Sequence, residues 1–444
     1  MTSDLQTVAG ALASAFLRGV WNERRLVARG ERMIGQRPVW LTPLVRRVLE
    51  GYHRPPADRP RELQAFIRVS LRDITGRARL AKRVEMRHWS PTPTVMVDRR
   101  WRVPILHTVG DLGALLGLDP GALMWLADAR GLERFAPEER LRNYRYTWVP
   151  RTTGAPRLLE APKARLKVAQ RDVLRRILCW VPPHDAAYGF IRGRSARDHA
   201  ARHTGREVVL SFDLMDFFAG VPARRVYGIY RLAGYPEPVA HCLTALCTNQ
   251  IPRTVSNDIL GRPDPAYALL RRRLGTPHLP QGAPTSPALA NLVAHALDRR
   301  LTGLAAALGG TYTRYADDLV ISGDAQLARR IGVAQRAVAE IAADEGFVIR
   351  PAKTRRMSRA DRQAVCGIVV NARTNIPRRD YDRLKAILHD AVRHGPDAAN
   401  RDGIADFRAH LAGRVAWVTS LNPDRGAKLR TTFDAIVWDP RPQT

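Results

Sequence analysis

Residues 312–322 read Tyr-Thr-Arg-Tyr-Ala-Asp-Asp-Leu-Val-Ile-Ser and place an acidic pair between two β-prone runs. The runs are Tyr312–Tyr315 and Leu319–Ser322, so the pattern predicts a tight hairpin with Asp317 and Asp318 at its tip. Neighbouring side chains alternate faces along a strand, whereas at a hairpin tip both can project toward one site. Two such carboxylates repel each other unless a cation lies between them, and Mg²⁺ is the cation that the pattern favours. The alternative interpretation of the hairpin alone is an acidic surface turn.

A further acidic residue ends another predicted strand. Residues 208–212 (Val-Val-Leu-Ser-Phe) form an apolar run of strand length, and Asp213 follows directly. A carboxylate there has no structural task that a serine could not perform at lower desolvation cost. Asp213 and Asp317 would supply carboxylates from two strands, enough to bridge two Mg²⁺ ions. Such ions, about 3.5–4 Å apart, can activate an attacking hydroxyl and stabilise the leaving oxygen of a phosphoryl transfer.

More motifs recur along the chain in order. They are Trp148–Arg151 with Gly154 and Arg157, Ala187–Phe190 with Gly193–Ser195, Leu279–Pro287, Gly346–Phe347 with Lys353, and Val365–Asn371. Together with Asp213 and the Tyr315–Asp318 hairpin, this series resembles a reverse transcriptase, most closely the bacterial retron type. The resemblance covers roughly residues 140–440, and several spaced motifs in family order are more specific than any one of them.

Three short segments bear on the retron assignment. Gly282-Ala283 replaces the Gly-Gly that is usual in group II intron enzymes, which favours retrons and related defence enzymes. Retron enzymes carry Asn-Ala-x-x-His before the first palm motif, and residues 199–203 read His-Ala-Ala-Arg-His here. They carry Val-Thr-Gly in the fifth motif, and residues 365–367 read Val-Cys-Gly. Another defence-associated reverse transcriptase with a different RNA is therefore the alternative.

The resemblance implies an α+β, right-hand polymerase fold. It assigns residues 106–205 to the fingers and 206–371 to a palm of antiparallel sheet plus helices, with a finger-side insertion at about 220–278. Residues 372–444 would form a helical, RNA-binding thumb. An Arg-rich and mostly helical N-terminal extension, residues 1–105, precedes the fingers and is broken by the proline-containing stretch 53–60.

Local signals predict particular helices. Two short helices are expected over 108–130 around the Gly117–Gly121 turn, as a packed helical hairpin or, alternatively, a helix-turn-helix. Ser286 and Pro287 read as the N-cap and first turn of a helix that runs to about Leu304. Another helix is predicted over 327–345, ending at Gly346.

Site roles follow from the resemblance. It makes Asp213, Asp317 and Asp318 the catalytic carboxylates and metal ligands, with the Leu214 carbonyl completing a metal shell. Phe218, five residues after Asp213, would exclude ribonucleotides by contact with the sugar, while Phe217 would be core. The nucleotide-binding residues are then Arg151 and Arg157 on the triphosphate, the backbone amides of Asp216 and Phe217, the sugar-contacting Phe218, the pocket residues Gln281 and Gly282, and Lys353, which could protonate pyrophosphate.

The same resemblance implies partners and an activity. A retron enzyme copies part of its own structured noncoding RNA into DNA from deoxynucleoside triphosphates, priming from an RNA 2′-hydroxyl to give a branched RNA–DNA hybrid in antiphage defence. An effector protein encoded nearby is a further candidate partner. The other hypothesis is an RNA-binding scaffold or defence switch with secondary polymerase activity. The expected RNA-binding residues are Arg378, Arg379, Arg383, Lys385 and Arg414.

Composition agrees with a nucleic-acid-binding protein. Lys and Arg total 72 and Asp and Glu total 42, so the formal charge is +30. A chain this basic is expected to neutralise phosphates and to bind them with a steep salt dependence. A GC-rich genome, which favours arginine, is the alternative explanation of the charge.

The cysteines and the apolar runs indicate a cytoplasmic protein. His241, Cys242 and Cys247 offer only three zinc ligands in an apolar helical stretch, so buried thiols are the favoured interpretation. The four cysteines form no Cys-x-x-Cys pair and suit a reducing compartment. No apolar run reaches the roughly 18 residues of a membrane span, so we expect no membrane segment. The N-terminus lacks a basic region followed by a continuous apolar one, so we expect no signal peptide.

Overall fold

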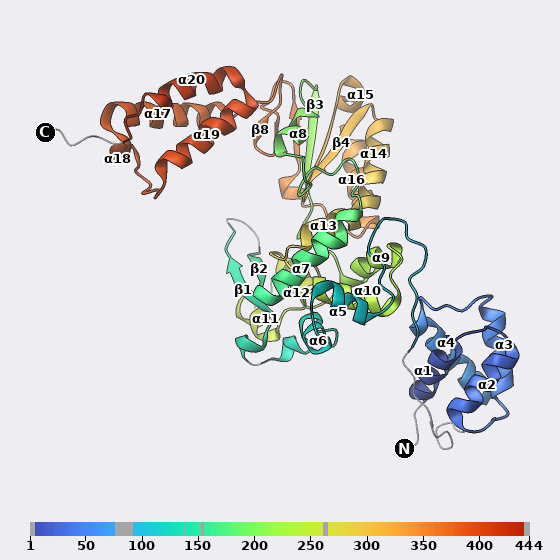
Figure 1. Cartoon of the computed structure of the whole chain (residues 1–444). Helices are drawn as coiled ribbons and strands as arrows, with labels where there is room; N and C mark the ends of the chain where they lie inside the picture. Colours follow the sequence, from blue (N-terminus) through green and yellow to red (C-terminus); the bar gives the residue numbers. More distant parts are fainter. Residues whose placement is uncertain (1–4, 76–91, 137, 152–154, 261–264, 439–444) are drawn as a thin grey trace. The chain divides into compact units, whose positions relative to one another are not determined.

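The computed structural model describes residues 5–75, 92–136, 138–151, 155–260 and 265–438 of the 444-residue chain. The chain divides into two compact units (Figure 1). Unit 1 comprises residues 1–182 and 221–289, and unit 2 comprises residues 183–220 and 290–444. The described part is a mixed helical and β-sheet fold in which the paired strands are antiparallel.

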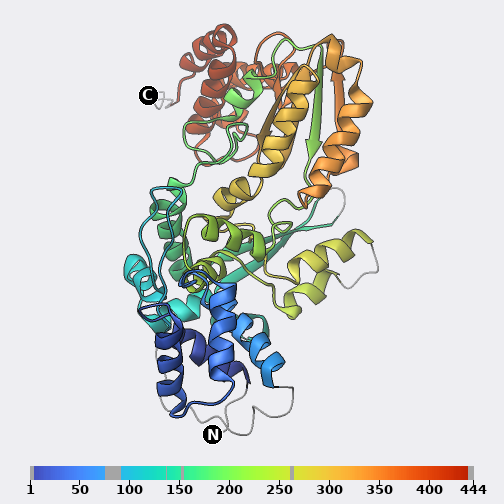
Figure 2. The same cartoon turned by 90° about the vertical axis from the view of Figure 1, so that its right-hand side faces the viewer.

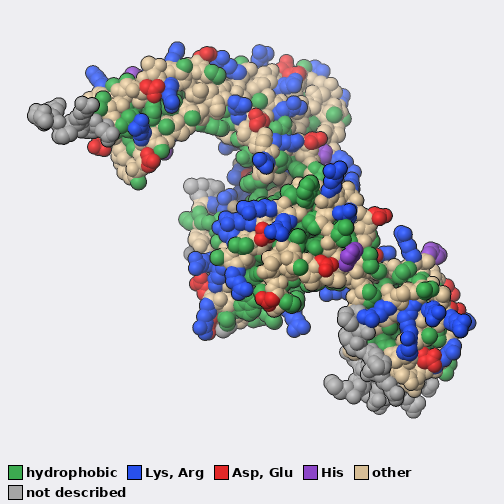
Figure 3. All heavy atoms as spheres, viewed as in Figure 1, with side chains coloured by type: hydrophobic (Ala, Val, Ile, Leu, Met, Phe, Trp, Pro, Cys, Tyr) green, Lys and Arg blue, Asp and Glu red, His purple; other side chains and the backbone are tan. Residues whose placement is uncertain are grey.

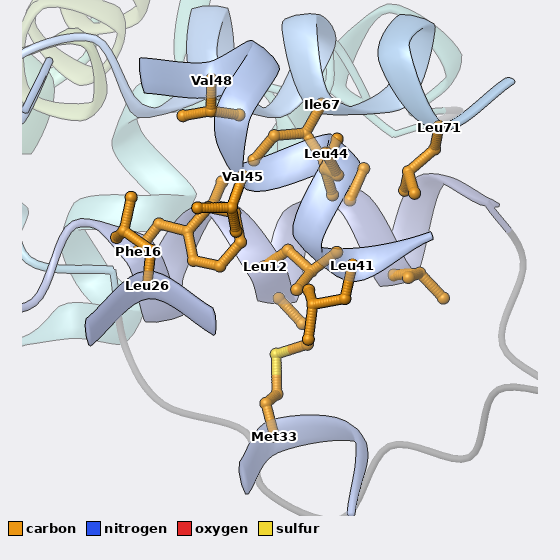
Figure 4. Close-up of a cluster of buried hydrophobic side chains, with 14 of the residues drawn as sticks. Leu12, Phe16, Leu26, Met33, Leu41, Leu44, Val45, Val48, Ile67 and Leu71 are labelled. Carbon is orange, nitrogen blue, oxygen red and sulfur yellow. The ribbon is translucent and has the colours of Figure 1, made fainter. Parts of the chain in front are cut away.

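Unit 1 begins with helices α1 (Leu5–Phe16), α2 (Glu23–Ile34), α3 (Leu41–Gly51) and α4 (Pro60–Thr75). Apolar side chains recur at helical spacing on each, and they meet in a core of their own, which includes Leu12, Phe16, Leu26, Leu44 and Ile67 (Figure 4). The Asn22 side chain caps the start of α2, and Gly35 ends that helix at φ 79°. The predicted helical character of the N-terminal extension is confirmed for residues 5–75, whereas its described residues 92–105 form no helix.

The remainder of unit 1 is built around a β-hairpin and a group of helices. Strands β1 (Tyr144–Val149) and β2 (Arg157–Pro162) pair with each other. The predicted short helices are present as α5 (Val109–Leu116) and α6 (Pro120–Ala127), joined through Gly117 at φ 64°. The other elements are η1 (Glu133–Phe135), η2 (Glu139–Leu141), α7 (Ala164–Arg176), η3 (Leu178–Trp180), α9 (Ala223–Leu232), α10 (Glu237–Cys247), α11 (Arg253–Leu260) and α12 (Pro265–Leu274).

Unit 2 contains the sheet that carries the acidic residues. Its strands are β3 (Val208–Asp213), β4 (Gly310–Tyr315), β5 (Asp318–Gly323) and β6 (Arg355–Ser358), in the order β4-β5-β3-β6. Helices α14 (His295–Ala307) and α16 (Ile331–Asp344) lie alongside these strands in both views (Figures 1 and 2). The shorter elements of the unit are α8 (Ala196–Ala201), α15 (Ala325–Ala328), η4 (Pro351–Lys353), β7 (Ala364–Val365) and β8 (Ile368–Val369).

Two long helices expected from the sequence are each divided. The first consists of α13 (Ser286–Val293) and α14, which separate at Ala294, although the amides of Ala294 and Asp298 still bond four residues back. The Ser286 hydroxyl donates to the Pro280 carbonyl, so it does not act as the predicted cap. The second helix consists of α15 and α16, because Arg330 leaves helical geometry at φ −119° and ψ 22°. Its predicted end before Gly346 is confirmed, since Gly346 has φ 75°.

The C-terminal part of unit 2 is helical, as predicted. Its elements are α17 (Arg378–His394), α18 (Pro396–Ala399), α19 (Phe407–Leu421) and α20 (Pro423–Asp434). Leu384, Leu388, Val415, Leu429 and Phe433 are among the side chains that form its own hydrophobic cluster. Among the described residues, no helix combines the length and the apolar character needed to cross a lipid bilayer.

Candidate active site

The strand register brings the three acidic residues together. Strands β3 and β5 pair so that Asp213 lies directly opposite Asp318, and the chain between β4 and β5 turns through Ala316 and Asp317. The Leu214 amide donates to the Asp317 carbonyl at 2.9 Å, which ties the end of β3 to this turn. The hairpin and the buried strand predicted from the sequence are both confirmed.

A buried ion pair stabilises the turn between β4 and β5. Arg314 and Asp298 are both fully buried, and the Arg314 Nη2 lies 2.7 Å from Asp298 Oδ2. Arg314 Nη1 also donates to the Ala316 carbonyl at 3.1 Å and to Asn291 Oδ1 at 2.9 Å. Ala316 has φ 57°, a left-handed conformation that a residue with a Cβ rarely adopts. The Arg314 contact therefore stabilises the strained residue that precedes the acidic pair.

A glycine allows a second segment to approach the same turn. The Tyr188 amide donates to the Arg314 carbonyl at 2.7 Å, and the Asn291 side chain donates to the Gly189 carbonyl at 2.9 Å. A Cβ on Gly189 would lie 2.6 Å from the Ala316 nitrogen, so no larger residue fits without a backbone shift. This contact explains why the Ala187–Phe190 motif contains a glycine.

Two cations contact Asp213. Lys353 Nζ lies 2.6 Å from Asp213 Oδ1, and Arg350 Nε lies 3.4 Å from Asp213 Oδ2. The Arg350 amide also donates to the Asp213 carbonyl at 2.8 Å. Burial, followed by the charges of Asp317 and Asp213, raises the pKa of Asp318 to about 6. Positive charge is therefore favourable at this edge of the sheet.

The residues at this edge fit a divalent cation chemically. Asp213 Oδ2 is buried and makes no hydrogen bond in the structure. Carboxylate oxygens of this kind are the ligands that divalent cations such as Mg²⁺ prefer. Among the described residues, the structure contains no group of three or more His, Cys, Asp or Glu side chains arranged to hold a metal ion. In the arrangement observed, Lys353 and Arg350 neutralise Asp213 instead.

The two aromatic residues after Asp213 differ in exposure. Phe217 is buried at 4% exposure and packs against Phe347 with ring centroids 5.9 Å apart. Phe218 is half-buried and lies 6.1 Å from the Phe190 ring. Asp216 has φ 49°, and its carbonyl accepts from Gly220 at 2.7 Å in the turn that follows β3. Phe218 is thus the ring of the pair that a ligand can reach.

Unit 1 brings together part of the predicted nucleotide site. The Glu160 amide on β2 donates to the Gln281 carbonyl at 2.8 Å, so Gln281 and Gly282 lie beside the strand that begins at Arg157. Gly282 has φ 132°, and a Cβ there would lie 2.9 Å from the Glu160 carbonyl oxygen. Packing against β2 therefore requires a glycine at position 282, a requirement that sequence reasoning missed. Arg151 follows β1.

The comparisons with known proteins agree with one another. A family model described as reverse transcriptase (RNA-dependent DNA polymerase) matches residues 149–379. The retron Mx65 reverse transcriptase of Myxococcus xanthus is 40% identical over 332 residues, which cover 74% of this chain and 72% of that protein. The chain belongs to the retron-type reverse transcriptases. The retron Mx162 enzyme of M. xanthus is 36% identical over 72% of this chain and 65% of the relative, and the retron Ec86 enzyme of Escherichia coli is 29% identical over 76% and 92%.

Membership confirms the family resemblance seen in the sequence. The reverse transcriptase is an RNA-directed DNA polymerase of a retron, with an RNA template and nucleotide substrates. Enzymes with this domain generally use divalent metal ions, in keeping with the acidic residues at the edge of the sheet.

Two histidines of the retron signature segment are buried in the enzyme. His203 bonds the Ser322 hydroxyl at 2.7 Å and the Thr313 hydroxyl at 2.6 Å, so it connects β5 to β4. Burial lowers the pKa of His203 to about 3 and that of His199 to about 4, so both imidazoles are neutral at pH 7. His199, which stands at the asparagine position of the signature, lies 3.4 Å from the Cys366 sulfur. The two departures from the retron pattern are therefore in contact with each other.

Cys242 and Cys247 behave as the sequence indicated. Cys242 and Cys247 are buried, and burial raises the pKa of their thiols to about 12 and 11. His241 stacks on Tyr227 with centroids 4.4 Å apart. This segment of the reverse transcriptase is therefore structural.

The basic residues predicted to bind RNA lie on two C-terminal helices of the enzyme. Arg378, Arg379, Arg383 and Lys385 are exposed on α17, and Arg378 lies 3.5 Å from Asp382. Arg414 on α19 is half-buried, and burial, followed by the charge of Arg383, lowers its pKa. The predicted RNA-binding residues therefore come from two different helices.

Sequence reasoning missed the buried polar groups that support these sites. In unit 2 these are Arg314, Asp298 and Asn291, and in unit 1 Glu160 bonds His278 at 2.9 Å and Asn249 at 2.7 Å. The one available signal was the position of Arg314 two residues before the Ala-Asp-Asp turn.

Proposed function

We propose that this reverse transcriptase copies part of its own structured noncoding RNA into DNA, priming from a 2′-hydroxyl of that RNA to give a branched RNA–DNA hybrid. The observation that carries the proposal is the opposition of Asp213 and Asp318 across β3 and β5, with Asp317 in the adjoining turn. A protein that only bound RNA would have no reason to keep three mutually repelling carboxylates at one sheet edge.

Asp213 and Asp317 would hold two Mg²⁺ ions, with Asp318 and the Leu214 carbonyl in support. Bound there, the ions would activate the attacking hydroxyl and stabilise charge on the leaving oxygen. We assign to Lys353 Nζ, 2.6 Å from Asp213, the donation of a proton to departing pyrophosphate. Arg350 contacts both Asp213 and Asp216 and would keep the end of β3 in position.

The deoxynucleoside triphosphate would contact groups contributed by several motifs. Arg151 and Arg157 carry fork-shaped donors suited to phosphate oxygens, as do the amides of Asp216 and Phe217. The half-buried Phe218 ring would clash with a ribose 2′-hydroxyl and so select deoxyribonucleotides. Gln281 and Gly282 would line the nucleotide pocket beside β2.

The remaining parts of the chain would serve RNA recognition. We assign residues 106–205 to the fingers, 206–371 to the palm and 372–444 to a thumb that binds the cognate RNA through Arg378, Arg379, Arg383, Lys385 and Arg414. Recognition would rest on RNA shape and on single-stranded loop bases. We further propose that the enzyme acts in the cytoplasm, in antiphage defence, together with an effector protein encoded nearby.

Nucleic acid that copurifies with the enzyme tests this function. The chain would be expressed with its flanking DNA, and the bound nucleic acid would be treated separately with ribonuclease and deoxyribonuclease. DNA that remains joined to a short RNA remnant after ribonuclease supports branched synthesis. An Asp317→Asn chain prepared in parallel should carry the RNA without the DNA. RNA alone on both chains would instead support the scaffold hypothesis and contradict the proposal.

A further inference from the structure

The N-terminal helices α1–α4 lie outside residues 149–379, the segment that the reverse transcriptase family model matches. They bury their own hydrophobic cluster, drawn in Figure 4, so they form a distinct structural element. Basic side chains are visible over this part of the surface in Figure 3. This helical element therefore presents a basic surface of its own, outside the segment that the family model matches.

One cavity on this element is lined by arginines. It has a volume of about 600 Å³ and lies between the end of α1 and one side of α2. No aspartate or glutamate among the described residues lines it. The remaining lining residues are small or apolar. The full lining set is Ala11, Ala15, Arg18, Gly19, Val20, Arg25, Arg29, Arg32 and Met33.

Three of the arginines belong to one side of α2. Arg25, Arg29 and Arg32 follow at spacings of four and three residues, which places their side chains next to one another on a helix. Like charges at these spacings destabilise a helix unless an anion lies between them. None of the three forms an ion pair with any residue that the structure describes.

Other arginines of the same element are neutralised by acids. Arg46 lies 3.1 Å from Glu23, and Arg47 lies 3.3 Å from Asp73. The Glu23 carboxylate belongs to α2 itself, yet it contacts Arg46 of α3 and does not line the cavity. The excess of arginine in this chain therefore does not by itself explain a cavity that lacks acids.

Arg29 is held in place at the centre of the arginine group. Its Nη1 donates to the Phe16 carbonyl at 3.0 Å, and its Nη2 donates to the Val20 carbonyl, so it caps the end of α1. The last turn of α1 contains no basic residue of its own. Burial, followed by the charges of Arg32 and Arg25, lowers the pKa of Arg29. Arg25 and Arg32 are exposed on either side of this fixed guanidinium.

We propose that this arginine cavity binds backbone phosphates of the RNA on which the reverse transcriptase acts. Guanidinium groups match phosphate oxygens with paired donors, and an exposed row of them suits a chain of phosphates. The described lining holds no aromatic ring to stack on a base and no amide or carboxylate side chain to read a base edge. Binding should therefore depend on charge and little on sequence. The identification of the ligand as RNA, among polymers that carry phosphates, rests on the proposed function.

The test compares two double variants of the full chain. Arg25→Gln with Arg32→Gln removes two charges from the cavity and leaves the α1 cap of Arg29 intact. Arg46→Gln with Arg47→Gln removes two charges that acids already neutralise on the same element. The probe is a fluorescently labelled RNA hairpin of arbitrary sequence, whose binding is followed by anisotropy at several salt concentrations. Thermal unfolding of each variant establishes that it is folded.

The cavity variant should bind the hairpin roughly tenfold more weakly, with a salt slope lower by roughly 1.5 units, as for two lost phosphate contacts. The matched variant should stay within about twofold of wild type, because its arginines lie in surface ion pairs. Equal affinities of the cavity variant and wild type would overturn the proposal, as would equal losses in both variants.

An acidic protein is the competing ligand. A labelled polyglutamate peptide that bound wild type as tightly as the hairpin does, and lost binding to the same extent in the cavity variant, would assign the cavity to an acidic partner and overturn the proposal. Extension of a generic DNA primer on an RNA template is measured in parallel. Failure of wild type to extend it would contradict the proposed function, whereas the binding comparison between the variants would still stand.

Discussion

Arg314 and Asp298 form a doubly hydrogen-bonded ion pair in the interior of unit 2, with Nε to Oδ1 at 2.8 Å and Nη2 to Oδ2 at 2.7 Å. Both side chains are fully buried, and Tyr312 donates to Asp298 Oδ1 at 2.8 Å. The remaining guanidinium nitrogen donates to the Ala316 carbonyl. The conformation of the acidic turn therefore depends on an ion pair that is fully buried behind it.

Replacement of Arg314 by Lys should impair synthesis by displacing this turn. Lysine keeps the charge but lacks the planar fork, so the Asp298 and Ala316 contacts cannot all be satisfied. We expect a loss of about 3 kcal/mol in unfolding free energy and an increased Mg²⁺ requirement. Denaturant unfolding and metal titration of primer extension measure these effects. The control is Arg300→Lys in the partly exposed pairs with Asp344 and Glu345; a similar loss there would contradict the positioning role.

Replacement of Asp213 or Asp317 by Asn should reduce DNA synthesis to background while RNA binding persists. The variant would lose the charge of a proposed metal ligand, while the basic surface proposed to bind phosphate would be unchanged. Primer extension and RNA anisotropy measure the two properties. Asp324→Asn, in the exposed pair with Arg206, is the matched control and should remain active. Near-wild-type synthesis by Asp317→Asn would show that this carboxylate is not a metal ligand.

The acidic site was predictable because it depends on local patterns. An apolar strand followed by Asp213, and a hairpin flanking two aspartates, are each specified by residues close together in sequence. Arg314 and Asp298 could not be paired in advance, since their contact arises from the packing of α14 on β4. The break before α16 was hidden because Leu327 and Ile331, four residues apart, both face the core on either side of it. The glycine requirement at position 282 likewise appears only when β2 packs beside it.

Replacement of His203 by Gln should make the enzyme less sensitive to acid. The pKa of His203 is about 3 in the folded chain and about 6.5 when unfolded, so its neutral form stabilises the fold above pH 6.5. That contribution is lost as the pH falls toward 3, by up to about 1.4 kcal/mol per pH unit. Unfolding free energies at pH 7, 6 and 5 should therefore fall less steeply for the variant than for wild type. Parallel curves would show that His203 does not control acid stability.

Replacement of Phe218 by Ala should increase ribonucleotide incorporation relative to deoxyribonucleotide. The half-buried ring is the group that would clash with a 2′-hydroxyl, and its removal opens that space. Competition between the two nucleotides during primer extension gives the ratio. Phe217→Leu is the comparison, because Phe217 is buried against Phe347 and should affect stability more than sugar choice. Unchanged discrimination in Phe218→Ala would identify Phe218 as a packing residue.

Neutralising Arg378, Arg379 and Arg383 should weaken binding of the cognate RNA. These side chains are exposed on α17, whose core residues Leu384 and Leu388 are untouched, so the fold should survive. Each lost phosphate contact should lower the salt slope of binding by roughly one unit.

Two extension assays on the same triple variant separate recognition from chemistry. In the proposed function, extension of a generic primer on a generic template depends on the acidic residues of the β3–β5 pair, so it should decline less than synthesis on the native RNA. A variant in which Arg329, Arg330 and Arg336 are neutralised removes the same charge from the α15–α16 region of the same unit and serves as the control. If both assays fell equally in the α17 variant, with the salt slope of RNA binding unchanged, α17 would not be the element that recognises the RNA.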